Sequence, residues 1–189
     1  MTARRLGLFG GTFDPPHFGH VAALRAASAT SRFDLIVVTV AGDPYQKSAR
    51  LALRPATLRL AMAEAAFGAL DLVEVSDREI RRVGPTYTID TVRELLDDAD
   101  EVDVIIGADL ARQLEQWHDA VALRELVRVG VVPRPGAQTI MPSGWEAYEI
   151  PMDPVDLSSS FIREAAPSTQ NLRKFVPEAV IPIYESFQG

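Results

Sequence analysis

The chain of 189 residues contains no cysteine, which excludes disulfides and thiolate metal sites. It also lacks an excess of basic residues, because 19 Lys and Arg stand against 26 Asp and Glu, for a formal net charge of −7. Nucleic acid is bound through clustered Lys and Arg, so it is not expected as the main partner. Any phosphate chemistry must therefore use local groups.

Long apolar runs are also missing. No stretch approaches the roughly 18 apolar residues of a membrane helix. The apolar run near the N-terminus is too short for a signal peptide before glycine and proline interrupt it. With 47% hydrophobic residues, the chain can bury one sizeable core, but it is too short for two comfortable domains. We therefore expect a single domain over residues 1–189 in a soluble, cytoplasmic protein.

Short runs rich in Val and Ile alternate with longer segments of helical period. This pattern is typical of an α/β fold in which flanking helices connect parallel strands. The expected strands are 5–9, 34–40, 70–75, 102–106, 127–132 and 145–150. The expected helices are 17–29, 55–67, 88–96, 110–117, 119–126, 159–166 and 177–187, with Pro182 breaking or kinking the last one.

The stretch GGTFDPPHFGH, residues 10–20, holds two of only three histidines in the chain. It follows the first expected strand, and ligands of open parallel sheets bind beyond the carboxyl ends of strands. Its glycine pair would let the backbone approach a ligand, and Asp14 with Pro15 would start a helix. His17 and His20 are three residues apart, so both would lie on one side of the first turn of this helix, at the positive end of its dipole. This arrangement suits a phosphate.

Two other interpretations apply to the histidine pair. His17 and His20 could bind zinc, although without cysteine a closed site would need His118 or carboxylates. They could also be core or capping histidines, a hypothesis that the neighbouring glycine and proline pairs weaken.

A second anion site is predicted near the other end of the chain, in DLSSSFIRE, residues 156–164. Ser158, Ser159 and Ser160 would open a helix with Arg163 one turn further, and hydroxyls with a guanidinium can hold an anion. The alternative is an ordinary helix cap beside a solvated arginine. Lys47, in the expected loop 41–54, would reach the same crevice if that loop folds over it, or would be solvated surface.

A carboxylate site is predicted at PTYTIDT, residues 85–91, immediately before the third expected helix. The amides of residues 86–88 would point outward at a helix N-terminus and could receive a carboxylate. The alternative is capping by Thr88 with Tyr87 packed below.

The segment after the fourth expected strand offers two further candidates. Asp109 could accept hydrogen bonds from ribose hydroxyls, or could cap the following helix. Trp117 could lay its indole on a flat cationic ring such as a pyridinium. It also falls on one helical stripe with Leu110, Leu114 and Val121, so plain core packing is the competing interpretation.

Residues 17–20 resemble the HxGH element of the nucleotidyltransferase superfamily, and LSSSFIR resembles its ISSTxIR element, with Leu157 for Ile and Ser160 for Thr. Five stretches together closely resemble the bacterial nicotinate-nucleotide adenylyltransferases: GGTFDPPHFGH, PTYTIDT, IGADL with the tryptophan that follows, VPRPG and SSSFIR. They stand in the order of that family and span nearly the whole chain. One departure is GDPYQK before Lys47, where the family commonly has Asn, prolines and His.

This resemblance implies a Rossmann-like doubly wound sheet and transfer of AMP from ATP to nicotinate mononucleotide, with pyrophosphate released and Mg²⁺ accompanying ATP, as a step of NAD biosynthesis. It implies no metal held by the protein itself, and no oligomeric state. The implied catalytic residues are His17, His20, Arg163 and Lys47; the implied ATP-binding residues are Gly10, Gly11, Thr12, Phe13, Gly107, Asp109, Ser158 and Ser159; the implied residues for nicotinate mononucleotide are Thr86, Tyr87, Thr88 and Trp117. The alternatives are a pantetheine-phosphate adenylyltransferase and a noncatalytic adenine-nucleotide sensor.

Overall fold

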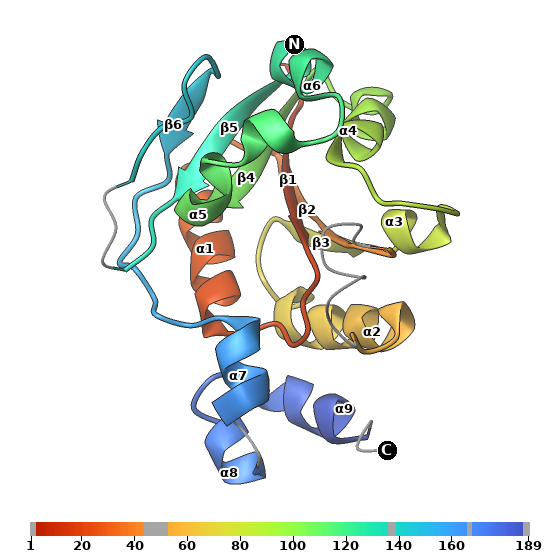
Figure 1. Ribbon diagram of the computed structural model, residues 1–189, viewed down its shortest axis with the longest axis vertical. Coiled ribbons are helices and arrows are strands. Elements are labelled where there is room, and N and C mark those ends of the chain that lie inside the picture. Colours follow the sequence, from red (N-terminus) through yellow and green to blue (C-terminus); the bar gives the residue numbers. More distant parts are fainter. Residues whose placement is uncertain (1–2, 44–52, 136–138, 166–167, 187–189) are drawn as a thin grey trace.

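The computed structural model describes residues 3–43, 53–135, 139–165 and 168–186, and within them a parallel sheet of six strands forms the centre of the fold (Figure 1). The strand order is β3-β2-β1-β4-β5-β6, and every pairing is parallel. This is the doubly wound order, so the predicted Rossmann-like α/β fold is confirmed. The strands are β1 (Arg5–Gly11), β2 (Leu35–Val40), β3 (Val73–Ser76), β4 (Glu101–Gly107), β5 (Val127–Val132) and β6 (Ala147–Glu149).

Helices cover both faces of the sheet, which is why its central strands are apolar along their whole length. The helices α1 (Phe18–Ala29) and α2 (Ala56–Phe67) pack with Val38 and Ile105 on one face. The helices α4 (Thr88–Leu96), α5 (Ala108–Ala111) and α6 (Ala120–Leu126) contribute to the core on the other face. Side chains of adjacent residues in β4 thus lie in the cores on opposite faces of the sheet, as the two-residue period of a strand requires.

The C-terminal pieces form a third, smaller cluster against α2, visible below the sheet in Figure 1. They are α7 (Ser159–Ala165), α8 (Thr169–Leu172), the 3-10 turn η2 (Glu178–Val180) and α9 (Ile181–Glu185). Pro182 lies in the first turn of α9, where its missing N–H costs nothing, so the predicted break falls just before it.

Several predicted boundaries are wrong for identifiable reasons. The strand β1 continues to Gly11 because β2 pairs with it that far, so the glycine pair lies within the strand. The helix predicted over 110–117 does not form: α5 ends at Ala111, a 3-10 turn η1 covers Leu114–Gln116, and Trp117 is extended. The predicted apolar stripe is broken, since Val121 is 62% exposed.

Two further features concern the switch point of the sheet and the length of the helices. The strand order reverses between β1 and β4, and the crevice at their carboxyl ends is where open α/β sheets bind ligands. Among the helices that the structure describes, none is long and apolar enough to cross a membrane.

Candidate active site

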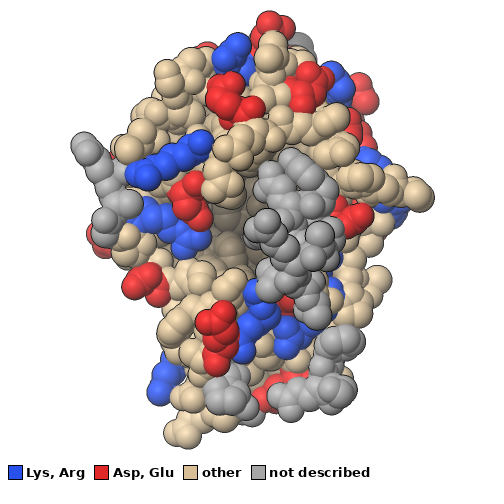
Figure 2. Space-filling model, in the orientation of Figure 1, with Lys and Arg blue, Asp and Glu red and all other residues tan. Residues whose placement is uncertain are grey.

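A cavity of about 460 Å³ opens at the carboxyl ends of β1 and β4. Figure 2 shows it as a hollow in the face of the molecule, with both basic and acidic side chains around it. Every predicted site residue lines it except Lys47, which lies outside the described residues. The cavity thus brings together Gly10, Gly11, Thr12, Phe13, His17, His20, Thr86, Tyr87, Thr88, Gly107, Asp109, Trp117, Ser158, Ser159 and Arg163.

The loop between β1 and α1 is held by packing that the sequence did not reveal. Phe13 is buried in a left-handed conformation, with φ of 50°. A Cβ on Gly11 would lie 2.6 Å from the Phe13 ring, so this glycine is needed for that close approach. Asp14 does not cap α1, contrary to prediction, because its buried carboxylate accepts hydrogen bonds from the Arg54 side chain at 2.9 Å and backbone N–H at 3.2 Å. His17 occupies the N-cap position instead.

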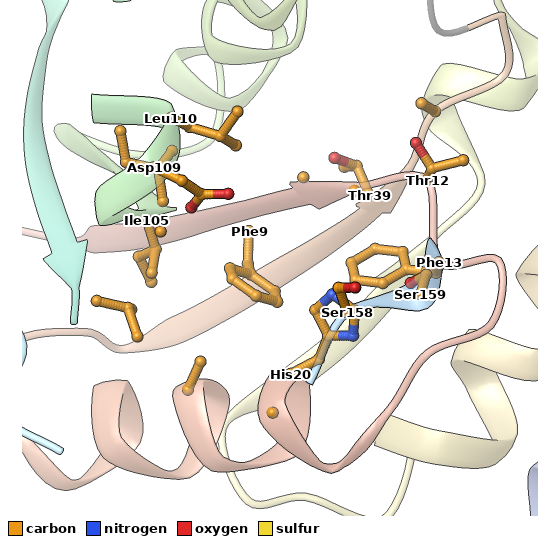
Figure 3. A pocket seen from close by; sticks show the side chains of 18 of the residues that line it. Phe9, Thr12, Phe13, His20, Thr39, Ile105, Asp109, Leu110, Ser158 and Ser159 are labelled. Atoms are coloured by element: carbon orange, nitrogen blue, oxygen red, sulfur yellow. The ribbon is translucent and has the colours of Figure 1, made fainter. Parts of the chain in front are cut away.

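The two imidazoles stack on each other, with ring centroids 3.7 Å apart and planes 28° from parallel. The backbone N–H of His17 donates to Nδ1 of His20 at 3.2 Å. Because Nδ1 is the acceptor, the neutral His20 ring carries its proton on Nε2. His20 also packs edge-on against Phe13, with centroids 5.0 Å apart, as Figure 3 shows. The N-terminus of α1 therefore presents an imidazole N–H donor whose orientation is fixed by two contacts.

His17 is neutral at physiological pH. Its side chain is 2% exposed, and this burial, with a smaller contribution from the charge of Arg134, lowers its pKa from 6.5 to about 4. Its Nδ1 has no hydrogen-bond partner among the described residues. A neutral, weakly basic imidazole is suited to donating one hydrogen bond and poorly suited to removing a proton.

Two segments distant in sequence meet at this cavity. Arg163 of α7 donates from Nη1 to the carbonyl of Asp14 at 2.6 Å, across 149 residues. The hydroxyl of Ser159 donates to the carbonyl of Pro15 at 2.8 Å. Ser158 accepts from the N–H of Phe161, so capping by this serine is confirmed, whereas a merely solvated arginine is not. Figure 3 shows Ser158 and Ser159 beside His20.

A second corner of the cavity is built by the ends of β4 and β5. Asp109 lies inside α5 and Gly107 is its N-cap, so the capping alternative for Asp109 is wrong. A Cβ on Gly107 would lie 2.5 Å from Asp109 Oδ1, so the glycine leaves room for that carboxylate. Arg134 approaches the same oxygen at 3.5 Å and donates to the carbonyl of Leu157 at 2.9 Å. The carboxylate remains 55% exposed and available to hydroxyl groups.

The opposite wall is formed by the segment before α4. The N-cap of α4 is Tyr87, so capping by Thr88 is wrong. The N–H of Thr86 donates to the carbonyl of Asp43 at 3.1 Å, and this amide therefore does not point outward as predicted. Tyr87 stacks on His118 with ring centroids 3.9 Å apart.

The core packing of Trp117 is confirmed, and its stacking on a ligand ring stays a prediction. Trp117 packs against the core cluster beneath α4 and also lines the cavity. The next residue in the chain, His118, is exposed and lines the cavity as well. A flat ligand ring entering this wall would therefore find three aromatic side chains, Tyr87, Trp117 and His118, among the lining residues.

Sequence reasoning gave no role in this site to Arg54, Arg59 and Arg134, and it named His118 only as a possible zinc ligand. Arg134 stands in the VPRPG stretch, and His118 is the third histidine of the chain, directly after Trp117. Arg54 and Arg59 gave no signal, because an arginine that pairs with a distant carboxylate, as Arg54 does with Asp14, or that donates to backbone carbonyls, as Arg59 does, resembles a solvated one in sequence.

The doubly wound sheet, with an imidazole pair and an arginine converging at its switch point, defines the class of nucleotide-binding α/β transferases. Residues 8–165 match the cytidylyltransferase-like family model. The chain is 36% identical to the probable nicotinate-nucleotide adenylyltransferase of Shouchella clausii, over 96% of this chain and 94% of that one. It is 35% identical to the one of Bordetella avium, over 94% and 93%. The chain belongs to the nicotinate-nucleotide adenylyltransferase family.

A solved structure has the same fold. It is the Plasmodium falciparum nicotinic acid mononucleotide adenylyltransferase complexed with NaAD, which superposes with a TM-score of 0.80. The match covers 97% of this chain and 96% of that one at 17% sequence identity, so it bears on the fold alone.

Proposed function

We propose that this chain transfers AMP from ATP to nicotinate mononucleotide, which releases pyrophosphate and forms nicotinate adenine dinucleotide, a step of NAD biosynthesis. One observation carries the proposal: the histidine pair and Arg163 converge on a cavity whose other wall is the segment 86–88 with Trp117. Membership of the family supports it. We also propose that residues 1–189 act as one nucleotidyltransferase domain.

ATP would lie along the carboxyl edge of β1 and β4. Its triphosphate would face the N-terminus of the twelve-residue helix α1, where anions are favoured, with Ser158, Ser159 and Arg163 on the β and γ phosphates. The strand residues Gly10 and Gly11, with the loop after them, would bring the backbone near the nucleotide. The ribose hydroxyls would donate to Asp109. Lys47 is proposed as a further phosphate ligand, from a part of the chain outside the described residues.

The reaction needs positioning and charge stabilisation more than proton transfer. An oxygen of the acceptor 5′-phosphate forms a bond to the α-phosphorus of ATP, while the bond from that phosphorus to the α–β bridging oxygen breaks and pyrophosphate leaves. A phosphate monoester is already an anionic nucleophile, so no general base is required. His20, through Nε2–H, and the neutral His17 would donate hydrogen bonds to the phosphoryl oxygens as charge develops there.

The acceptor base would sit against the wall before α4. A carboxylate near the N-terminus of this nine-residue helix gains from the helix dipole, and a neutral amide gains less. The indole of Trp117 would stack on the pyridinium ring, an interaction worth up to about 2 kcal/mol when desolvated. The acid form of the nucleotide is therefore the preferred acceptor.

Nucleotidyltransferases of this kind generally use a divalent metal with ATP. Among the described residues, no group of three or more His, Asp or Glu side chains could hold such an ion, and the buried Asp14 carboxylate is already paired with Arg54. We propose that the metal is Mg²⁺ accompanying ATP, which would neutralise charge on the triphosphate; phosphate and water oxygens are ligands that Mg²⁺ prefers. The protein residues then bind the phosphates.

A pyrophosphate-release assay with ATP and Mg²⁺ tests the proposal. Nicotinate mononucleotide, nicotinamide mononucleotide and phosphopantetheine are compared as acceptors at equal concentration. We expect nicotinate mononucleotide to be turned over fastest. Faster turnover of phosphopantetheine would identify a pantetheine-phosphate adenylyltransferase instead. Tight ATP binding without pyrophosphate from any acceptor would identify a nucleotide sensor, and either result overturns the proposal.

A further inference from the structure

Arg59, on α2, is 2% exposed and does not line the cavity, yet all its donor nitrogens point at loops that do. Its Nη1 donates to the carbonyl of Thr12 at 2.9 Å, and its Nη2 to the carbonyl of Gly42 at 3.2 Å. Its Nε donates to the carbonyl of Arg54 at 3.0 Å. One buried guanidinium thus holds three separate backbone segments.

This is an unusual use of a buried charge. No ion pair of Arg59 is found within the described residues, and the nearby Asp14 carboxylate is paired with Arg54. Burial lowers the pKa of the Arg59 guanidinium, and the nearby Asp14 charge opposes that effect, but an arginine stays protonated at any physiological pH. Apolar side chains often fill such a site at equal or better stability. What the guanidinium adds is its rigid fork of donors in fixed directions.

Two of the three carbonyls connect Arg59 to different walls of the site, because Thr12 lines the cavity and Gly42 adjoins a residue that is bonded to the wall before α4. Thr12 is followed by Phe13, whose ring packs edge-on against His20. Gly42 is followed by Asp43, which exchanges two hydrogen bonds with Thr86: Thr86 N–H to the Asp43 carbonyl at 3.1 Å, and Asp43 N–H to the Thr86 hydroxyl at 3.2 Å. A continuous chain of contacts therefore runs from the imidazole donor through Arg59 to the acceptor wall.

We propose that Arg59 is a positioning residue. It fixes the distance between the loop that joins β1 to α1, which would face the triphosphate, and the segment 86–88, which would face the acceptor. This inference rests on the proposed function, because an in-line transfer depends on how two substrates are placed relative to each other. A misplacement of about 1 Å in such an arrangement costs about 100-fold in rate. Arg59 touches neither substrate, so its loss acts on the geometry of the reaction and much less on the affinity for either nucleotide.

The test replaces Arg59 by Met, which keeps an apolar stem and removes all three donors. We expect kcat to fall about 30-fold to 100-fold, with the KM values for ATP and for nicotinate mononucleotide each within about threefold of the wild type. Arg59→Lys keeps the charge but offers a compact ammonium instead of a fork, so its kcat should lie between that of the wild type and that of Arg59→Met. This milder variant carries the kinetic test if Arg59→Met does not fold.

The matched control is Leu6→Ala, at the amino end of β1 and away from the cavity. Leu6 is 2% exposed, so its truncation also lowers the melting temperature. We expect the control to keep kcat within about twofold of the wild type at temperatures where it is folded. An equal loss of kcat in the control and the Arg59 variants would reduce Arg59 to a stability role and overturn the inference. So would a loss confined to KM.

A second readout is independent of activity. In ¹⁵N-histidine NMR spectra of the ligand-free protein, the ring nitrogens of His20 report its tautomer and its hydrogen bond from His17. We expect these resonances to move in the Arg59 variants and to stay unchanged in Leu6→Ala. Unchanged resonances in the Arg59 variants would overturn the inference. If the wild type turned over no acceptor at all, the proposed function would fail, and this spectrum would still decide whether Arg59 positions His20.

Discussion

Acid should destabilise this protein through His17, and the size of the effect follows from its burial. Well above pH 6.5 the ring is neutral in both the folded and the unfolded chain, so it adds no pH dependence there. Between pH 6.5 and about 4 the unfolded chain takes up a proton that the folded chain does not, so the free energy of unfolding falls as the pH falls. Lowering the pKa from 6.5 to about 4 corresponds to about 3 kcal/mol when the titration is complete.

The assay compares urea unfolding of the wild type and His17→Gln at pH 7 and about pH 4.5. Glutamine keeps a polar side chain of similar reach and cannot titrate, while most other groups respond to acid equally in both proteins. The wild type should lose about 2.5 kcal/mol more than the variant over this interval. Equal losses would mean that the pKa of His17 is the same in the folded and the unfolded protein, and this would refute the conclusion that burial keeps the ring neutral.

Three further substitutions test the site by steady-state kinetics, with a melting curve to verify folding. His20→Ala should lower kcat by about 100-fold or more, because one preorganised donor is lost; near-normal turnover would contradict this. Arg163→Lys should lower kcat/KM for ATP by at least about tenfold, since an ammonium cannot replace the fork that binds the carbonyl of Asp14; an unchanged value would show that charge alone suffices. Gly107→Ala should raise the KM for ATP several-fold with little change in kcat, because its Cβ would displace the carboxylate of Asp109; an unchanged KM would place the ribose elsewhere.

The parts of the fold that sequence predicted well are those where one physical pattern dominates. The strand over 127–132 is correct at both ends, because Val-rich residues buried on both faces fit little else. The helix over 88–96 is also correct, and its apolar residues Ile89, Val92 and Leu95 all face the core. The histidine pair was found because its spacing and its place after a strand are local properties.

The wrong predictions concern segments whose local sequence pattern fits two different structures. Asp14 in DPP resembles a helix start, but the buried carboxylate is instead held by Arg54 from a distant segment. Leu110, Leu114 and Trp117 have helical spacing, yet this part of the chain forms two short helical pieces, α5 and η1. Asp119, which follows them, has a left-handed backbone with φ of 51°. Tertiary contacts decided both cases, and they are not visible in a window of a few residues.

The arginines were missed for a related reason. Arg59 and Arg134 bind backbone carbonyls, and every residue of a chain carries one, so no partner residue type marks such a site in sequence. Only the folded backbone shows which carbonyls converge. The resemblance to a family located the stretches that line the cavity, and the structure alone showed what holds them together.

The central claim is that the histidine pair and α7 bind one triphosphate. A crystal structure with a non-hydrolysable ATP analogue and Mg²⁺ tests it most directly. We predict phosphate oxygens within hydrogen-bond distance of both His20 Nε2 and the Arg163 guanidinium. A triphosphate bound to only one of these groups, with the other facing away, would contradict the account.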